Sequence, residues 1–130
     1  MAYLVDTNVA IHARDGTDAV LNKLAQHEGQ VLLSALSRAE LRRGVYRDPS
    51  LMATRQARLG VLLRGLPVLP FDVSAALAYG QIIAQCGWVR GLDYDRMIAA
   101  HAINGNSVVV TSNTADFSDI TGLSMENWVV

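Results

Sequence analysis

Four short apolar runs, separated by longer segments, limit the fold of this chain more than any other feature. The runs are Tyr3-Leu4-Val5, Val31-Leu32-Leu33, Val68-Leu69 and Val108-Val109-Val110. Strands without polar alternation are buried on both faces, which is typical of a parallel sheet covered by helices. The segments between the runs repeat apolar residues at helical spacing, so the pattern predicts an α/β fold. We expect a short central parallel sheet of four to five strands with helices on both faces, the fifth strand being residues 128–130 at the sheet edge.

Length and composition bound the class of protein. A chain of 130 residues, 51% of them hydrophobic, fits one domain over residues 1–130 with its own core. No apolar run approaches the length needed to span a bilayer, and no secretory signal is recognisable at the start. The single cysteine, Cys86, excludes an internal disulfide framework and fits a reducing compartment. We therefore expect a cytoplasmic protein with no membrane association.

Helical spacing also predicts which side of each helix faces the core. In the helix that Asp72 caps, one set of residues recurs at this spacing and is expected to point inward: Val73, Ala76, Leu77, Gly80, Ile83 and Ala84. In the helix after the second strand, Arg38, Arg42 and Arg43 are expected to point outward.

Acidic residues follow three of the predicted strands. Asp6 comes directly after the first strand, Glu40 lies within two helical turns of the second, and Asp116 follows the fourth. Because the carboxyl ends of parallel strands open on one edge, we expect these carboxylates to converge there. Plainer roles exist for each of them. Asp6 can cap the next helix, Ser37 and Glu40 form a capping box, and loop aspartates such as Asp116 are usually solvated.

Two further aspartates, Asp93 and Asp95, enter the almost wholly apolar helix that precedes the fourth strand. One of them is expected to cap that helix, which leaves the other for chemistry. We prefer Asp95 for the chemical role and keep Asp93 as the alternative. Asp119, further along, is interpreted as an ordinary surface residue.

Four neighbouring carboxylates repel one another, and a hard divalent cation relieves that repulsion. With oxygen ligands and no histidine or cysteine cluster, Mg²⁺ is the expected metal and Mn²⁺ a possible substitute.

A second feature is the distribution of charge along the chain. The chain carries a net charge of −1, yet seven of its eleven basic residues, all arginine, fall between positions 38 and 64. A solvated helix surface would explain them, and so would a face that binds phosphate groups or a protein partner.

Together these motifs resemble the PIN-domain ribonucleases, and their order is similar to that of the VapC toxins of type II toxin–antitoxin pairs. The motifs are Leu4-Val5-Asp6-Thr7-Asn8, Ser34 to Leu41 with Gly44, Asp95-Arg96-Met97-Ile98-Ala99-Ala100, Val110 to Phe117, and a final tryptophan, Trp128. The resemblance covers the chain from Tyr3 to Trp128.

The resemblance implies a metal-dependent endoribonuclease that cleaves RNA, is inhibited by a cognate antitoxin and forms a homodimer. By position, Asp6, Glu40 and Asp95 match the metal-binding acids, and Asp116 matches a fourth. Thr7 and Asn113 match polar residues that support the site by hydrogen bonds. The arginines Arg38, Arg42 and Arg43 would contact RNA or the antitoxin. Two alternatives stay open: a non-catalytic binding module of the same fold, and a nuclease that acts on DNA.

Overall fold

The computed structural model describes residues 1–129, which contain a five-stranded sheet in the order β3-β2-β1-β4-β5 with every neighbouring pair parallel. The strands are β1 (Ala2–Val5), β2 (Val31–Ser34), β3 (Val68–Leu69), β4 (Ser107–Val110) and β5 (Met125–Glu126). The helices are α1 (Thr7–Arg14), α2 (Asp18–Gln26), α3 (Ala35–Arg47), α4 (Met52–Arg64), α5 (Val73–Cys86), α6 (Asp93–Asn104) and the short 3₁₀ helix η1 (Thr114–Phe117). The α/β architecture expected from the apolar runs is confirmed.

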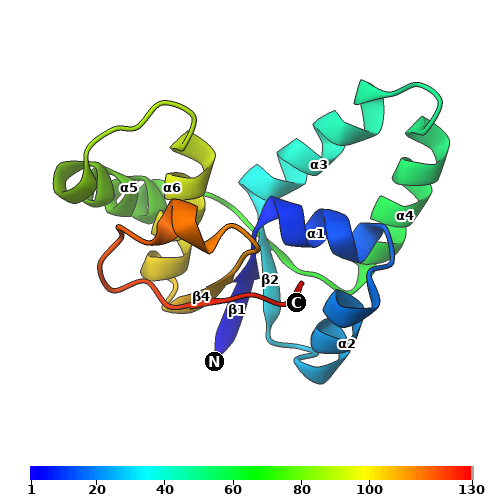
Figure 1. Cartoon of the computed structure of the whole chain (residues 1–130), viewed down its shortest axis with the longest axis horizontal. Coiled ribbons are helices and arrows are strands. Elements are labelled where there is room, and N and C mark those ends of the chain that lie inside the picture. Colours follow the sequence, from blue (N-terminus) through cyan, green and yellow to red (C-terminus); the bar gives the residue numbers. More distant parts are fainter. Residues whose placement is uncertain (130) are drawn as a thin grey trace.

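Helices cover both faces of the sheet (Figure 1). Val5 and Val110 pack with residues of α1 to α4 in one apolar cluster. Their neighbours Leu4 and Val109 point the other way and pack with α5, α6 and η1 in a second cluster. Because successive strand residues face opposite sides, each strand has to be apolar throughout, as the sequence pattern required.

The register of the strands brings three polar residues to one edge of the sheet. Val5 pairs with Leu33 on one side and with Val110 on the other. The residues that follow these, Asp6, Ser34 and Thr111, therefore leave the sheet side by side. The helices that follow β1 and β2 cover one face, whereas α5 and α6, which follow β3, cover the other (Figure 1). The order of the strands reverses between β1 and β4, and such a switch point is where open α/β sheets bind ligands.

The fifth strand lies earlier in the chain than expected. It is Met125–Glu126, paired with Val109 and Val110 of β4. Trp128, expected in that strand, is instead buried in the core, where its ring stacks on His27 with the ring centroids 5.4 Å apart. Trp128 therefore buries its indole ring beside His27 at the end of α2 and does not extend the edge strand. Val130 lies outside the described residues.

The inward face of α5 is also not the one that helical spacing predicted. Val73 and Leu77 are 86% and 67% exposed, while Ala75, Ala78 and Ile82 are buried. In the partner helix, α6, six of the twelve residues are buried, all between Arg96 and Ala102. The face of α5 that packs inward is therefore the one turned toward this cluster, with Ala78 and Ile82 in it and Tyr79 against it.

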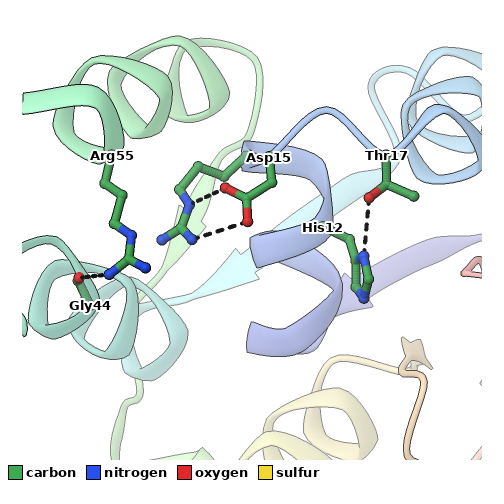
Figure 2. A network of polar contacts seen from close by, with 6 residues as sticks. His12, Asp15, Thr17, Gly44 and Arg55 are labelled. Carbon is green, nitrogen blue, oxygen red and sulfur yellow. Dashed lines mark hydrogen bonds and ion pairs between the residues drawn. The ribbon is translucent and has the colours of Figure 1, made fainter. Parts of the chain in front are cut away.

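The helices beside β2 and β3 are joined by polar contacts as well as apolar ones. Arg55 of α4 donates a 2.9 Å hydrogen bond to the carbonyl oxygen of Gly44 in α3 (Figure 2). Nδ1 of His12 in α1 lies 3.0 Å from the Thr17 hydroxyl that precedes α2 (Figure 2).

None of the helices within residues 1–129 is both long and apolar enough to cross a membrane.

Candidate active site

Asp6 lies at the switch point, and each of its two carboxylate oxygens accepts a hydrogen bond. Oδ1 accepts a 2.7 Å bond from the backbone N–H of Thr7 and so caps α1. Oδ2 accepts a 2.9 Å bond from the hydroxyl of Thr111, the residue after β4. The side chain is fixed by the start of α1 and by the residue after β4, and the capping role uses only one of its oxygens.

Burial shapes the protonation of Asp6. The residue is only 4% exposed, and this loss of hydration is the largest effect on its pKa. The hydrogen bonds from Thr111 and Thr7 lower the pKa, but the negative charges of Glu40 and Asp116 raise it. The net result is a pKa above the usual aspartate value, because burial and repulsion together outweigh the hydrogen bonds.

Glu40 does not belong to a capping box, so that interpretation was wrong. The N-cap of α3 is Ser34, whose hydroxyl oxygen accepts a 3.1 Å bond from the N–H of Leu36. The helix therefore starts at Ala35, directly after β2, and Ser37 lies inside its first turn. The sheet register decides this start, because β2 is paired up to Ser34.

With Ser37 inside the helix, its hydroxyl and the carboxylate of Glu40 both meet Thr7. The Thr7 hydroxyl donates a 2.7 Å hydrogen bond to Oε1 of Glu40 and lies 3.0 Å from the hydroxyl of Ser37. Thr7, predicted to support the site, thus joins the first turn of α1 to α3. Ser37 was expected only as a cap, and it completes this contact.

Asp95, in the first turn of α6, receives the electrostatic influence of all three other carboxylates. Its pKa is raised to about 6, first by burial and then by the negative charges of Asp6, Asp116 and Glu40. A carboxyl group affected in this way identifies a point where negative charge converges. The charges of Asp6, Glu40 and Asp116 therefore all act on Asp95.

Asp93 has different partners from Asp95. Its Oδ1 accepts hydrogen bonds from the Tyr79 hydroxyl at 3.1 Å and from the Trp88 indole N–H at 2.9 Å. Neither aspartate caps α6, because its N-cap is Leu92 and no side chain bonds there. These contacts hold Asp93 toward α5 and the loop after it, and they favour Asp95 as the residue available for chemistry.

Asp116 lies in η1, which follows β4. The next residue, Phe117, is fully buried in the second apolar cluster and anchors this segment. Asn113 contributes its backbone only, since its N–H donates a 3.0 Å bond to the Thr111 hydroxyl oxygen while its side chain is exposed. Thr111 was not among the residues predicted for the site. The signal that could have identified it is its position, one residue after a buried strand, which is also the position of Asp6.

The donor set suits a hard divalent cation, because it consists of carboxylate oxygens. Burial first, and then repulsion among these groups, raises the pKa of Asp6 and of Asp95. Among residues 1–129 no three histidine, cysteine, aspartate or glutamate side chains are already gathered as a metal-binding group. Asp6 and Glu40 are instead held by hydrogen bonds to threonine. The chemistry of the donors fits Mg²⁺ or Mn²⁺.

The predicted cationic residues beside this site, Arg38, Arg42 and Arg43, are all exposed on α3. Arg43 approaches Glu40 only loosely, with 3.8 Å between Nη2 and Oε2. Exposed pairs of this kind contribute little to stability. These guanidinium groups are therefore available to other partners.

Comparison with known proteins gives a consistent set of relatives. The family model of the PIN domain matches residues 3–123. The chain is 31% identical to "Ribonuclease VapC2" of Rickettsia felis and 30% identical to "tRNA(fMet)-specific endonuclease VapC" of Shigella flexneri, in each case over 98% of both chains.

Solved structures agree with the sequence comparison. VapBC2 from Rickettsia felis, bound to a DNA fragment from its promoter, superposes with a TM-score of 0.88 at 30% identity, covering 98% of this chain and 99% of the other. DNA-bound VapBC from Salmonella typhimurium superposes with a TM-score of 0.89 at 28% identity, covering 98% of each chain.

Proposed function

The chain belongs to the PIN-domain family, and on that basis we propose that it is a metal-dependent endoribonuclease, the toxin of a type II toxin–antitoxin pair. The observation that carries this proposal is the position of Asp6 at the switch point, where Thr7 and Thr111 hold it and Thr7 also holds Glu40. The pKa of Asp95, raised to about 6 by burial and by three other carboxylates, supports it. Perturbed carboxylates gathered at a switch point are typical of a catalytic site. The ribonuclease names of the relatives support RNA as the substrate.

Asp6, Glu40, Asp95 and Asp116 would hold the cation, with Mg²⁺ expected and Mn²⁺ as a substitute. When bound, such a cation supplies Lewis-acid activation of a phosphodiester and neutralises negative charge on it. The raised pKa values of Asp6 and Asp95 support this role, because a cation would stabilise carboxylates that burial and mutual repulsion destabilise.

The residues of the chain itself supply a fixed arrangement. Thr111 and the Thr7 N–H hold both oxygens of Asp6, and the Thr7 hydroxyl orients Glu40. Asp95 lies directly before the buried part of α6, which extends from Arg96 to Ala102. Groups that need no reorganisation at the moment of reaction are the usual source of rate enhancement in such sites.

RNA would be held through its phosphates by the exposed guanidinium groups of α3. Arginine binds phosphate with two parallel hydrogen bonds, and contacts of this kind position a nucleic acid without reading its sequence. Arg38, Arg42 and Arg43 lie on the helix that carries Glu40, so RNA bound there would pass beside the carboxylates.

Two protein partners belong to the proposal: a cognate antitoxin that inhibits cleavage, and a second copy of the chain. The VapBC composition of the similar structures supports an antitoxin. Val73 and Leu77 of α5 are large apolar side chains left exposed, as surfaces covered by another protein often are. Size-exclusion chromatography with light scattering, with and without the antitoxin encoded by a neighbouring gene, tests both partners.

The test of function uses purified protein with structured RNA and with DNA of the same sequence. We expect cleavage of RNA with Mg²⁺ or Mn²⁺, none in chelator, and none by the Asp6→Asn variant when its circular dichroism matches the wild type. Cleavage by folded Asp6→Asn at the wild-type rate would contradict the assignment. Cleavage of DNA alone would indicate a DNA nuclease of this fold, and binding without cleavage would indicate a non-catalytic module.

A further inference from the structure

A buried arginine follows directly after Asp95. Arg96 is 1% exposed, and its Nη2 donates a 2.9 Å hydrogen bond to Oδ2 of Asp119. Its Nε and Nη1 are buried and have no hydrogen-bond partner among residues 1–129. A buried cation with a single partner is expensive, and replacing such a pair with apolar residues is often neutral or stabilising. Stability alone is therefore a poor reason for an arginine at this position.

The partner, Asp119, was interpreted as an ordinary surface residue, and its contacts show otherwise. Its carboxylate is held by Arg96 from α6, and its carbonyl oxygen accepts a 3.3 Å hydrogen bond from the thiol of Cys86, the last residue of α5. The hydrogen bond between the two side chains raises the pKa of Arg96 and lowers that of Asp119. Both residues are therefore charged, and the segment after η1 is tied to two helices.

Asp119 belongs to residues 113–120, a segment that also contains η1 and Asp116, three residues before Asp119. Phe117 and Ile120 insert into the apolar cluster that includes Ile98 of α6. Apolar contacts are not directional, so they determine how deeply the segment sits but constrain its rotation and sliding only weakly. A charge-assisted hydrogen bond has a defined distance and direction. The bond from Arg96 to Asp119 adds the constraint that the apolar anchors lack.

We propose that Arg96 is a positioning residue: through Asp119 it holds the segment that carries Asp116 in fixed register with the helix that carries Asp95. Adjacent residues of α6 then have two linked tasks. Asp95 belongs to the carboxylate site, and Arg96 binds Asp119 in the segment that supplies Asp116. The catalytic part of this inference rests on the proposed nuclease function, whereas the ordering of the segment does not.

The chain contains a matched control. Arg14 has a side chain that is only 6% exposed, and its Nε lies 2.9 Å from Oδ1 of Asp15 (Figure 2). This pair is at the last turn of α1, the end opposite to Asp6. Arg14→Met and Arg96→Met therefore remove the same kind of ion pair, but only the second touches the segment of Asp116. Ile98→Val controls for a small loss of packing in the same apolar cluster.

Two measurements are made on the full-length protein. The first is amide hydrogen exchange of residues 113–120, which needs neither metal nor RNA. The second is RNA cleavage, resolved into kcat and KM. The variants are Arg96→Met, Asp119→Ala and the double variant. Asp119 has a side chain that is 53% exposed, so it can be hydrated when its partner is removed. A shift of Asp116 by about 1 Å is expected to lower kcat by roughly 10- to 100-fold, with little change in KM.

Arg96→Met is expected to accelerate exchange in residues 113–120 and to lower kcat, while Arg14→Met and Ile98→Val leave both at wild-type values. Because Arg96→Met and Asp119→Ala remove the same hydrogen bond, the double variant should lose no more kcat than the more severe single variant. Unchanged exchange in Arg96→Met, additive effects in the double variant, or an equal loss of kcat in Arg14→Met would each overturn the proposal. If the wild-type protein cleaves no RNA, the proposed function fails and the exchange data still decide the role of Arg96.

Discussion

The hydroxyl of Thr111 donates a 2.9 Å hydrogen bond to Oδ2 of Asp6, joining residues that are 105 positions apart in the sequence. Each residue directly follows a central strand, so the bond closes the switch point of the sheet. It leaves Asp6 with one oxygen engaged by the start of α1 and the other by the end of β4. The position of the central carboxylate therefore depends on both halves of the chain.

Replacing Thr111 with valine should weaken RNA cleavage. The variant keeps the shape of the side chain but removes the donor, so the pKa of Asp6 rises further and the carboxylate is less firmly placed. A hydrogen bond to a charged group contributes about 1.5–3 kcal/mol, which corresponds to a loss of roughly 10- to 100-fold in kcat. Thr121→Val, at an exposed position, is the control and should retain wild-type activity. Full activity of Thr111→Val would show that the bond is dispensable.

Replacing Asp95 with asparagine should stabilise the metal-free protein at neutral pH. The folded pKa of about 6 lies above the ordinary value of 3.8, so the folded state binds the proton more tightly than the unfolded state. Wild-type stability therefore falls as pH rises from about 4 to about 6 through this group, and the neutral variant escapes that loss. Thermal unfolding in chelator should show a gain in Tm that is absent near pH 4, grows up to pH 6 and is constant above. A gain that is the same at every pH would contradict the assigned cause.

The same substitution at Asp93 should have little effect on catalysis. An asparagine there retains the oxygen that accepts hydrogen bonds from Tyr79 and Trp88, and it removes a charge that is directed away from the other acids. We expect Asp93→Asn to cleave RNA within about two-fold of the wild-type rate, because surface substitutions outside special features cost little. Asp95→Asn should be inactive under the same conditions. The opposite result, an inactive Asp93→Asn and an active Asp95→Asn, would show that Asp93 is the metal-binding residue.

Replacing Arg38, Arg42 and Arg43 together with glutamine should weaken RNA binding and leave the chemical step intact. KM is expected to rise while kcat stays within about two-fold of the wild-type value, as for the loss of uniform binding. The salt dependence of binding should become shallower, by about 0.7 in slope for each phosphate of a single strand that the variant no longer neutralises. Arg64→Gln serves as the control, since Arg64 ends α4 just before β3, away from the strand ends that carry the acids. An unchanged salt slope would assign these arginines to another partner.

Much of the fold could be read from the sequence because the determining signals are local. Apolar runs such as Val108 to Val110 report strands buried on both sides, and Asp72 marks the start of α5 by capping it at 2.9 Å. The facing of α5 could not be read in this way. Val73 and Leu77 are exposed, whereas Ala75, Ala78 and Ile82 are buried. Which face of α5 turns inward depends on where α6 lies, and the periodicity of α5 contains no information about that position.

The candidate site likewise has a part that local sequence signals predict and a part that depends on packing between distant segments. The carboxylates that follow the strands could be identified from the chain alone, since Asp6, Glu40 and Asp116 are placed by short-range position. The contacts that hold them could be found only in the folded molecule: Thr111 on Asp6, Thr7 on Glu40, and Arg96 on the segment of Asp116 through Asp119. It also separated Asp93 from Asp95 by giving Asp93 partners in α5 and the loop that follows it. The physical reason is that hydrogen bonds and ion pairs act over about 3 Å, so they depend on residues distant in sequence whose proximity is created by strand register and helix packing.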